Sequence, residues 1–289
     1  MRFLTALMLS LFAAGAAWAT TPPGQPSPGG LGFQEAVTPI MERITWFNNV
    51  LLIIVTLITL VVTGLLVWVM FRYRAKANPE PAKWSHNTLL EVVWTGIPVL
   101  ILLGIAVPSF ALLYFDERVP DGTGEIPAPA FTIKATGYQW NWGYEYPELG
   151  VSEFTSSMIA DADIDPAAGQ VRNLSVDNPL VVPVNATVRL QVTAGDVIHN
   201  WAMPSFGTKV DAIPGRLNES WFHVYEEGTY FGQCSELCGR AHAFMPIEVR
   251  VVDQATFDAF IAAGPGTPEA NELVYAYQSA RETRLAQLD

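Results

Sequence analysis

Twelve consecutive residues hold an unusual concentration of soft metal ligands. The stretch Cys234-Ser-Glu-Leu-Cys-Gly-Arg-Ala-His-Ala-Phe-Met245 contains both cysteines of the chain, one of its four histidines and a methionine. Thiolate, imidazole and thioether groups favour copper over hard cations, and a site for a single blue copper ion needs only one cysteine. Two thiolates on one loop could instead bridge two copper ions. His199, which lies thirty-five residues before Cys234, is the obvious source of a second imidazole.

Two other interpretations of the cysteine pair remain open at this point. Paired cysteines in an exported domain often form a disulfide, and thiolates together with imidazoles also hold structural zinc. A disulfide does not call for the histidine and methionine that follow Cys238. Structural zinc favours four strong ligands, and methionine is a poor one. The pattern therefore favours copper over both alternatives.

The pattern Cys-Ser-Glu-Leu-Cys-Gly-x-x-His-x-x-Met, with Asp-Val-Ile-His199 upstream, resembles the binuclear copper (CuA) site of cytochrome c oxidase subunit II. The similarity extends from about the first long apolar segment to the end of the copper domain. The resemblance implies two bridging thiolates, one imidazole for each copper ion, and two weak ligands, a thioether and a main-chain carbonyl. In this chain the corresponding residues are Cys234 and Cys238, His199 and His242, and Met245 and Glu236.

The same resemblance implies roles for residues outside copper ligation. The carboxylate of Glu236 would bind magnesium or manganese at the interface with subunit I, and a carboxylate suits such a hard cation. Glu91, in Leu-Leu-Glu-Val-Val-Trp94, matches the mouth of a proton-uptake pathway into subunit I. Taken without the resemblance, Glu91 is better explained as a carboxylate at the membrane interface that reaches water.

A segment rich in aromatic residues lies upstream of His199. Residues 137–146 contain five aromatic residues at alternate positions: Tyr138, Trp140, Trp142, Tyr144 and Tyr146. Alternation predicts that they share one face of a strand, and for most of them a place in a buried core. The resemblance implies that Trp140 lies exposed near copper and receives electrons from bound cytochrome c. Many relatives have histidine in place of Tyr138 and an aromatic residue in place of Asn141, so the detail of the docking patch differs here.

The distribution of charge excludes one class of partner. From Asp116 onward the chain has 24 Asp and Glu residues against 10 Lys and Arg residues. This acidity argues against a nucleic-acid partner and favours a basic protein, although an acidic surface can also serve solubility alone. The resemblance implies that Glu145, Asp177 and Asp196 face the lysines of cytochrome c, and such complementary charge mainly raises the encounter rate.

The N-terminal residues predict export. Arg2 precedes a short apolar run, and Ala17-Trp18-Ala19 has the form of a signal-peptidase site, so residues 1–19 are expected to be a cleaved signal peptide. Residues 20–43 would form a periplasmic lead. Its first part, residues 20–34, is rich in proline and glycine and is expected to be flexible.

Two charge-free runs predict a membrane hairpin. Ile44–Phe71 has 28 residues and Val92–Phe115 has 24. As a helix the first run would span roughly 42 Å, more than a bilayer requires, and the prolines at positions 98 and 108 are tolerated as kinks. The connecting loop, residues 72–91, is basic and therefore expected to be cytoplasmic. The protein would span the bacterial inner membrane twice, with its copper domain in the periplasm.

Residues 116–252 show short alternating runs separated by Gly, Pro, Asn and Asp, a pattern typical of an antiparallel sandwich or barrel. The resemblance implies a cupredoxin-like Greek-key β-sandwich, so the predicted fold class is a membrane-anchored all-β protein. The acidic stretch 147–173 is expected to be a surface excursion, and residues 253–289 a helical tail.

The resemblance implies that the chain is subunit II of a bacterial aa3-type cytochrome c oxidase, with subunits I and III and cytochrome c as partners. It would pass electrons to the haem of subunit I, where oxygen is reduced to water and protons are pumped. Nitrous oxide reductases carry the same copper centre but add a propeller domain, for which this chain has no room. Quinol-oxidase relatives have lost the copper ligands. A membrane-tethered copper carrier would need accessible, exchangeable ligands. No Cys-x-x-Cys-His motif for haem attachment is present.

Overall fold

The computed structural model describes residues 24–27, 29–80, 82–285 and 287. The expected signal peptide, residues 1–19, lies outside the described residues. The chain divides into two units, a helical hairpin of residues 39–118 and a β domain. The β domain combines the described residues up to Thr38 with those from Val119 onward.

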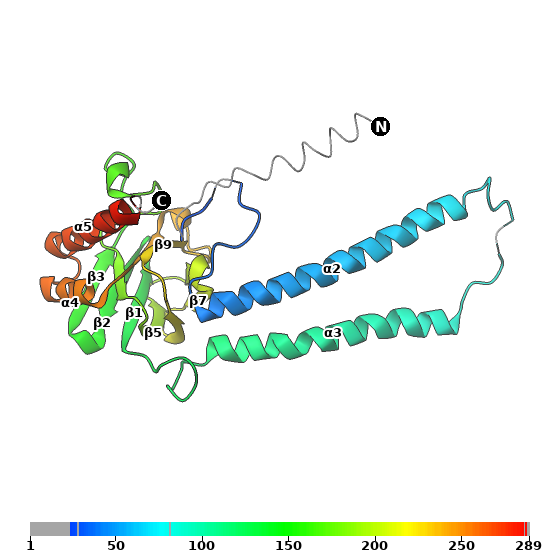
Figure 1. Cartoon of the computed structure of the whole chain (residues 1–289), viewed down its shortest axis with the longest axis horizontal. Helices are drawn as coiled ribbons and strands as arrows, with labels where there is room; N and C mark the ends of the chain where they lie inside the picture. Colours follow the sequence, from blue (N-terminus) through cyan, green and yellow to red (C-terminus); the bar gives the residue numbers. More distant parts are fainter. Residues whose placement is uncertain (1–23, 28, 81, 286, 288–289) are drawn as a thin grey trace. The chain divides into compact units, whose positions relative to one another are not determined.

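The hairpin consists of α2 (Pro39–Arg72) and α3 (Thr88–Glu117), which run side by side (Figure 1). Both helices are long and apolar enough to span a membrane. Each begins before its charge-free run, for reasons visible at its first turn. Pro39 stands at the first helical position, where proline has the right φ and no N–H is needed. The Asn87 side chain accepts a hydrogen bond from the main-chain N–H of Leu90 and so caps α3.

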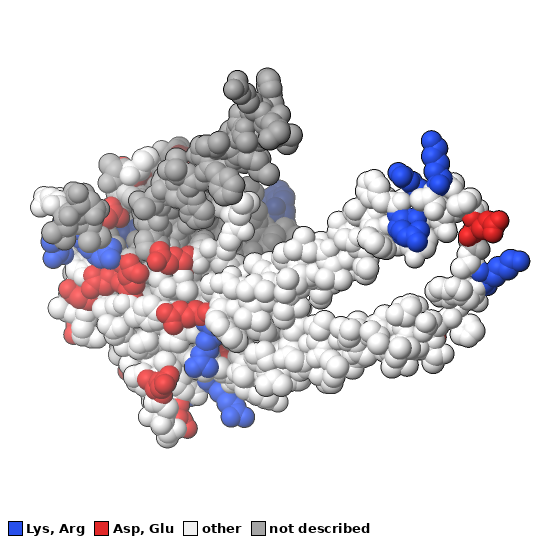
Figure 2. Space-filling model, turned by 45° about the vertical axis from the view of Figure 1, so that its right-hand side comes forward, with Lys and Arg blue, Asp and Glu red and all other residues white. Residues whose placement is uncertain are grey.

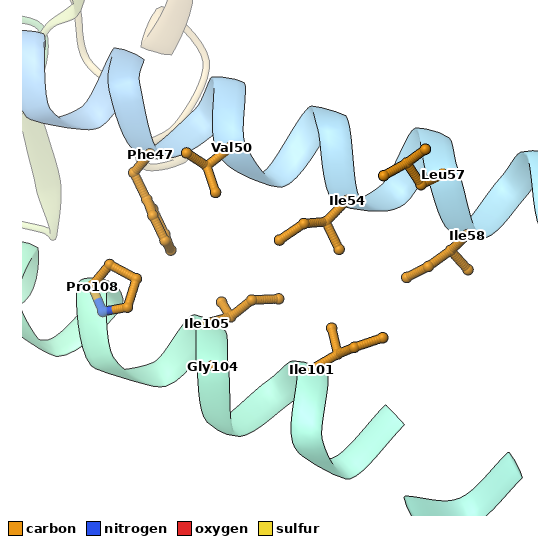
Figure 3. A pocket seen from close by; sticks show the side chains of 9 residues that line it. All are labelled: Phe47, Val50, Ile54, Leu57, Ile58, Ile101, Gly104, Ile105 and Pro108. Atoms are coloured by element: carbon orange, nitrogen blue, oxygen red, sulfur yellow. The ribbon is translucent and has the colours of Figure 1, made fainter. Parts of the chain in front are cut away.

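Charge is confined to the ends of the hairpin. Figure 2 shows the visible length of both helices without charged side chains and a group of basic side chains at the loop that joins them. The charged residues of this loop and its edges are Arg72, Arg74, Lys76, Glu80 and Lys83. Between the helices lies an apolar cavity of about 410 Å³ (Figure 3). Its lining residues are Phe47, Val50, Ile54, Leu57, Ile58, Ile101, Gly104, Ile105 and Pro108. With no polar side chain in the lining, this cavity offers only apolar contact.

The β domain is a sandwich of a five-stranded sheet, in the order β3-β2-β1-β5-β8, and a three-stranded sheet, in the order β4-β10-β9, with β6 and β7 as a separate ribbon. The first five strands are β1 (Phe131–Tyr138), β2 (Asn141–Tyr146), β3 (Val151–Ser156), β4 (Leu180–Pro183) and β5 (Thr187–Ala194). The others are β6 (His199–Met203), β7 (Thr208–Ala212), β8 (Asn218–His223), β9 (Gly228–Gln233) and β10 (Pro246–Val252). Alternate side chains of both sheets form one buried core.

Two pairings differ from the antiparallel expectation, because β5 runs parallel to β1 and β4 runs parallel to β10. The chain passes through β2, β3 and β4 before β5 returns beside β1, and such a crossover can bring strands together in parallel. The expectation of a surface excursion over residues 147–173 is wrong for Val151–Ser156, which forms β3 and pairs with β2. Alternation of residue types shows which face of a sheet a residue occupies. It does not show whether the neighbouring strand runs parallel or antiparallel.

The single aromatic strand expected over residues 137–146 is also wrong. The chain reverses at Gln139 and Trp140, so that Tyr138 pairs with Asn141 and β2 runs back along β1. Trp142, Tyr144 and Tyr146 are fully buried, whereas Tyr138 and Trp140 are partly exposed. Because a two-residue turn leaves the alternation of residue types uninterrupted, periodicity could not locate the reversal.

The N-terminal lead is attached to the β domain where the structure describes it. The N–H of Phe231 donates to the carbonyl of Gly24 at 3.1 Å, and the Ser205 hydroxyl donates to the Gln34 side chain at 2.7 Å. The N–H of Val37 donates to the carbonyl of Ser205 at 3.3 Å. The expected flexible lead is therefore held at both ends of its described part.

Two C-terminal helices pack against the strands of the β domain. α4 (Gln254–Ala263) and α5 (Pro268–Leu285) lie side by side (Figure 1), with α4 against β4 and α5 against β10. Under α5, the Arg250 guanidinium lies 2.6 Å from the Glu248 carboxylate and 3.9 Å from the ring centre of Tyr275. Glu248 is fully buried and also accepts from the N–H of Val176 at 2.9 Å. This buried ion pair joins β10, α5 and the loop before β4.

Candidate metal centre

The predicted ligands come from three adjoining strand ends. Cys234 directly follows β9 and Met245 directly precedes β10, and these two strands are paired from Gln233 and Pro246 onward. The cysteine loop is thus closed at its base by a regular ladder, and the N–H of Cys234 also donates to the carbonyl of Met245 at 3.4 Å. His199 is the first residue of β6. A rigid frame therefore holds both ends of the loop and the distant histidine.

The donor atoms fall into two groups about the two sulfurs, which are 3.9 Å apart. Around Cys234, the Nδ1 atom of His199 lies 3.9 Å from Sγ and the carbonyl oxygen of Glu236 lies 3.4 Å away. Around Cys238, Nδ1 of His242 and Sδ of Met245 each lie 3.5 Å from Sγ. Each sulfur thus has one imidazole and one weak donor of its own.

The cysteines are unbonded and nearly inaccessible. Their sulfur separation of 3.9 Å is far above the roughly 2.05 Å of a disulfide. Cys234 is 5% exposed, Cys238 is 4% exposed and His199 is fully buried. His199 and the two cysteines place their ligand atoms within 4.8 Å of one another, close enough to hold a metal ion. Six donors that include a thioether do not match the four strong ligands of structural zinc.

The two thiols differ in acidity. Burial raises the pKa of the Cys234 thiol, but hydrogen bonds with the His199 ring and with main-chain groups outweigh burial and hold that pKa below its ordinary value. Burial and the neighbouring charge of Cys234 raise the pKa of Cys238. One thiolate therefore forms readily, whereas the second needs a positive charge such as a metal ion beside it.

Asp196 orients the His199 ring, a role that the sequence did not indicate. Its Oδ1 atom lies 2.8 Å from Nε2 of His199, so the ring proton is held on Nε2 and the Nδ1 lone pair faces Cys234. Burial opposes ionisation of Asp196, but hydrogen bonds from the imidazole and from two main-chain N–H groups outweigh it and lower its pKa. A carboxylate on a ligating imidazole is a common way to fix the tautomer of a metal-binding histidine.

Two residues of the aromatic hairpin also support the ligands. A Cβ atom at Gly137 would lie 2.8 Å from the His199 ring, so the ring requires glycine at this position. The indole of Trp142 meets the His199 ring edge-on at 6.1 Å and donates its N–H to the carbonyl of Met245 at 3.3 Å. Trp142 therefore contacts one predicted ligand and bonds to the backbone of another.

Trp140 lies over the cysteine loop and is partly exposed. Gly239, which directly follows Cys238, has φ of 124°, and a Cβ atom there would lie 3.1 Å from Cζ2 of Trp140. The absence of a side chain at Gly239 thus allows the indole to approach the residue next to a predicted copper ligand. The structure brings Trp140 to the same end of the sandwich as the ligands.

The three predicted docking acids all have partners inside the β domain. Glu145 forms an ion pair with Lys134 at 2.5 Å, across β1 and β2. Asp177 accepts main-chain N–H bonds from Ser157 at 2.7 Å and from its neighbour at 2.8 Å, and Asp196 orients His199 as described. Of the three, Glu145 alone is paired with a lysine or arginine side chain among the described residues.

The last two predicted sites differ in exposure, since Glu236 is exposed and Glu91 is half-buried. Glu236 is an exposed residue whose main-chain carbonyl faces Cys234. Its side chain and its carbonyl therefore lie in different surroundings. Glu91 lies in the first turn of α3, where the helix dipole favours a carboxylate. It borders an open hollow that Thr88, Val92, Thr95 and Gly96 also line.

Comparisons with known proteins agree on one family. Residues 131–252 match the model of the cytochrome c oxidase subunit II periplasmic domain, and residues 26–112 match that of its transmembrane domain. A probable cytochrome c oxidase subunit 2 of Rickettsia felis is 51% identical over 239 residues, covering 83% of this chain and 73% of its own length. Cytochrome c oxidase subunit 2 of Cereibacter sphaeroides is 43% identical over 270 residues, covering 88% and 86%.

Among solved structures, the periplasmic domain of subunit II of cytochrome oxidase from Bradyrhizobium japonicum is 53% identical, covering 47% of this chain and 94% of that one with a TM-score of 0.44. The family models together span both the helical hairpin and the β domain. The chain is therefore a membrane protein that belongs to the cytochrome c oxidase subunit II family, and it works with the other subunits of that oxidoreductase complex.

Proposed function

We propose that this chain accepts electrons from cytochrome c at a binuclear CuA centre and passes them to the haem of subunit I. The observation that carries the proposal is the grouping of four further donors about two sulfurs 3.9 Å apart, with one imidazole and one weak donor on each side. This donor set would hold two copper ions, for which the thiolates of Cys234 and Cys238 would be the strong ligands. The copper pair would supply a one-electron carrier whose charge is spread over two metals.

The residues of the chain would keep that carrier rigid and dry. The ladder between β9 and β10 fixes the loop ends, Asp196 holds the His199 tautomer, and the core buries both cysteines. Little ligand movement is then possible when the centre gains or loses an electron. The burial of the cysteines also argues against a copper carrier, which needs ligands that a partner protein can reach.

The wider assembly follows from the same proposal. The β domain would lie in the periplasm and the basic loop between α2 and α3 in the cytoplasm, with residues 1–19 removed as a signal peptide. The Glu236 carboxylate would bind magnesium or manganese shared with subunit I, Glu91 would lie at a proton-uptake mouth, and subunit III would complete the complex. Of the docking acids, Glu145 would contribute least to attracting cytochrome c, because Lys134 neutralises it.

The test is the metal content and spectrum of the full chain in detergent, loaded with copper. We expect two copper ions for each chain and an EPR spectrum from one unpaired electron shared equally by two copper nuclei. A four-line spectrum from a single copper ion in the native protein would contradict the binuclear assignment. Zinc in the isolated protein, with no affinity for copper, would contradict the copper assignment altogether.

Trp140→Ala is expected to slow electron transfer from cytochrome c by at least about tenfold, since the indole bridges the surface and the cysteine loop. Copper content and the EPR spectrum should stay as in the wild type, because no metal ligand is changed. The measurement is stopped-flow oxidation of reduced cytochrome c by the assembled oxidase. Trp84→Ala, which removes an exposed tryptophan from the loop between α2 and α3, is the control. An unchanged rate in Trp140→Ala would remove this residue from the electron path.

A further inference from the structure

Gln139 connects the turn that carries Trp140 to the loop that carries the cysteines. Its side-chain amide donates to the carbonyl of Cys238 at 2.8 Å, across ninety-nine residues of chain. A Cβ atom at Gly239 would lie 3.1 Å from the Gln139 amide nitrogen and 3.1 Å from the Trp140 ring. The amide and the indole therefore lie together over Gly239.

The main chain of Gln139 is also hydrogen-bonded to the segment that carries His199. The N–H of Gln139 donates to Oδ2 of Asp196 at 2.7 Å, while Oδ1 of Asp196 lies 2.8 Å from Nε2 of His199. One carboxylate thus serves both the turn and a predicted copper ligand. Gln139 is in this way bonded to the backbone of Cys238 on one side and, through Asp196, to His199 on the other.

The Trp140 ring has no equivalent bond of its own. Its indole N–H is buried and has no hydrogen-bond partner among the residues that the structure describes. The position of the ring over Gly239 therefore depends on packing and on the turn that carries it. Of the contacts that hold this turn, the two hydrogen bonds from Gln139 go directly to Asp196 and to the main chain of Cys238.

We propose that Gln139 is a positioning residue for electron transfer, which keeps the Trp140 indole packed over the loop of Cys238 and so sets the rate at which electrons pass between them. This inference rests on the proposed function. Gln139 is not one of the predicted metal ligands and acts through Trp140. Displacement of the ring by even about 1 Å can lower a rate steeply when two groups must be held in one geometry.

The test compares Gln139→Met with the wild type in the assembled oxidase. Methionine keeps the length of the side chain and the main-chain N–H but removes the amide donor. We expect two copper ions and an unaltered EPR spectrum, an unchanged KM for cytochrome c, and a fall of roughly tenfold in the first-order rate within the complex. Gln191→Met is the matched control, because the side-chain amide of Gln191 bonds, among the described residues, to the exposed Glu219 side chain on the neighbouring strand, at 2.8 Å.

A second readout does not depend on copper or turnover. The metal-free full chain is labelled with 5-fluorotryptophan, and the Trp140 signal is assigned by its loss in Trp140→Phe. We expect the fluorine resonance of Trp140 to shift or broaden in Gln139→Met and to stay unchanged in Gln191→Met.

Three results would overturn the inference: an unchanged transfer rate, a raised KM as the sole effect, or loss of copper from the variant. The second would make Gln139 a docking residue, and the third a support of the metal site alone. Failure of the proposed function itself would be visible in the wild type, as absence of the two-copper spectrum, whatever the variant does.

Discussion

Cys238→Ser is expected to leave the full chain unable to hold a copper pair. The sulfur of Cys238 lies within 3.9 Å of Cys234 Sγ and 3.5 Å from both Nδ1 of His242 and Sδ of Met245, so the two groups of donors meet at this atom. A serine hydroxyl is a harder and much less acidic donor and cannot bridge copper as a thiolate does. Bound copper should fall to one ion or none, and oxidation of cytochrome c should stop.

Metal analysis and EPR of the full chain in detergent measure this effect. Ser235→Ala is the control from the same loop, because the Ser235 hydroxyl donates only to the carbonyl of Gln233, at 3.2 Å, and should leave copper in place. A Cys238→Ser protein that still held two coupled copper ions would show that the bridging atoms have been misassigned. Thermal unfolding of the metal-free variant should match the wild type, which separates ligand loss from misfolding.

Arg250→Met is expected to lower the free energy of unfolding of the β domain by roughly 3–5 kcal/mol, because it leaves the buried Glu248 carboxylate without its ion-pair partner. Glu248 is fully buried and Arg250 is 2% exposed. The N–H of Val176 would remain as a donor to Glu248 but carries no full charge. Contact with Tyr275 on α5 would be lost as well.

The measurement is urea unfolding of the full chain in detergent, followed by near-ultraviolet circular dichroism of the β-domain aromatic residues. Arg172→Met is the matched control, since the pair of Arg172 with Asp161 is largely exposed and worth about 1 kcal/mol or less. Equal effects of the two substitutions would mean that the buried pair contributes no more than a surface one.

The sequence predicted the class of fold well, together with the convergence of His199 and the cysteine loop. Alternating runs predicted a β domain within residues 116–252, and β1 to β10 all lie in that range. The charge-free runs predicted both helices, although capping by Asn87 starts α3 four residues before Val92. His199 and the cysteine loop do meet, as a metal site requires. The strands, the helices and the cysteine motif depend on local residue types, which a single sequence displays directly.

The supports around the ligands could not be predicted, because they depend on loops that meet only in the folded domain. Asp196 was interpreted as a docking acid, yet it binds His199 and the turn at Gln139, and the latter is fifty-seven residues away in the chain. Gly137 gives no signal of its own until the His199 ring is seen against it. The reversal at Gln139 and Trp140 was hidden for a different reason, since alternation continued through the turn.

The hydrogen bonds of the N-terminal lead bear on how the β domain can be prepared as a soluble fragment. Main-chain groups of Ser205 and Phe231 form hydrogen bonds with residues that precede α2. In the sequence, the membrane hairpin separates those residues from the rest of the β domain. A fragment that starts at Val119 would therefore expose those groups to water and uncover the surface on which the lead rests. Joining residues 24–38 to Val119 through a flexible linker would restore these bonds and keep that surface of the β domain covered.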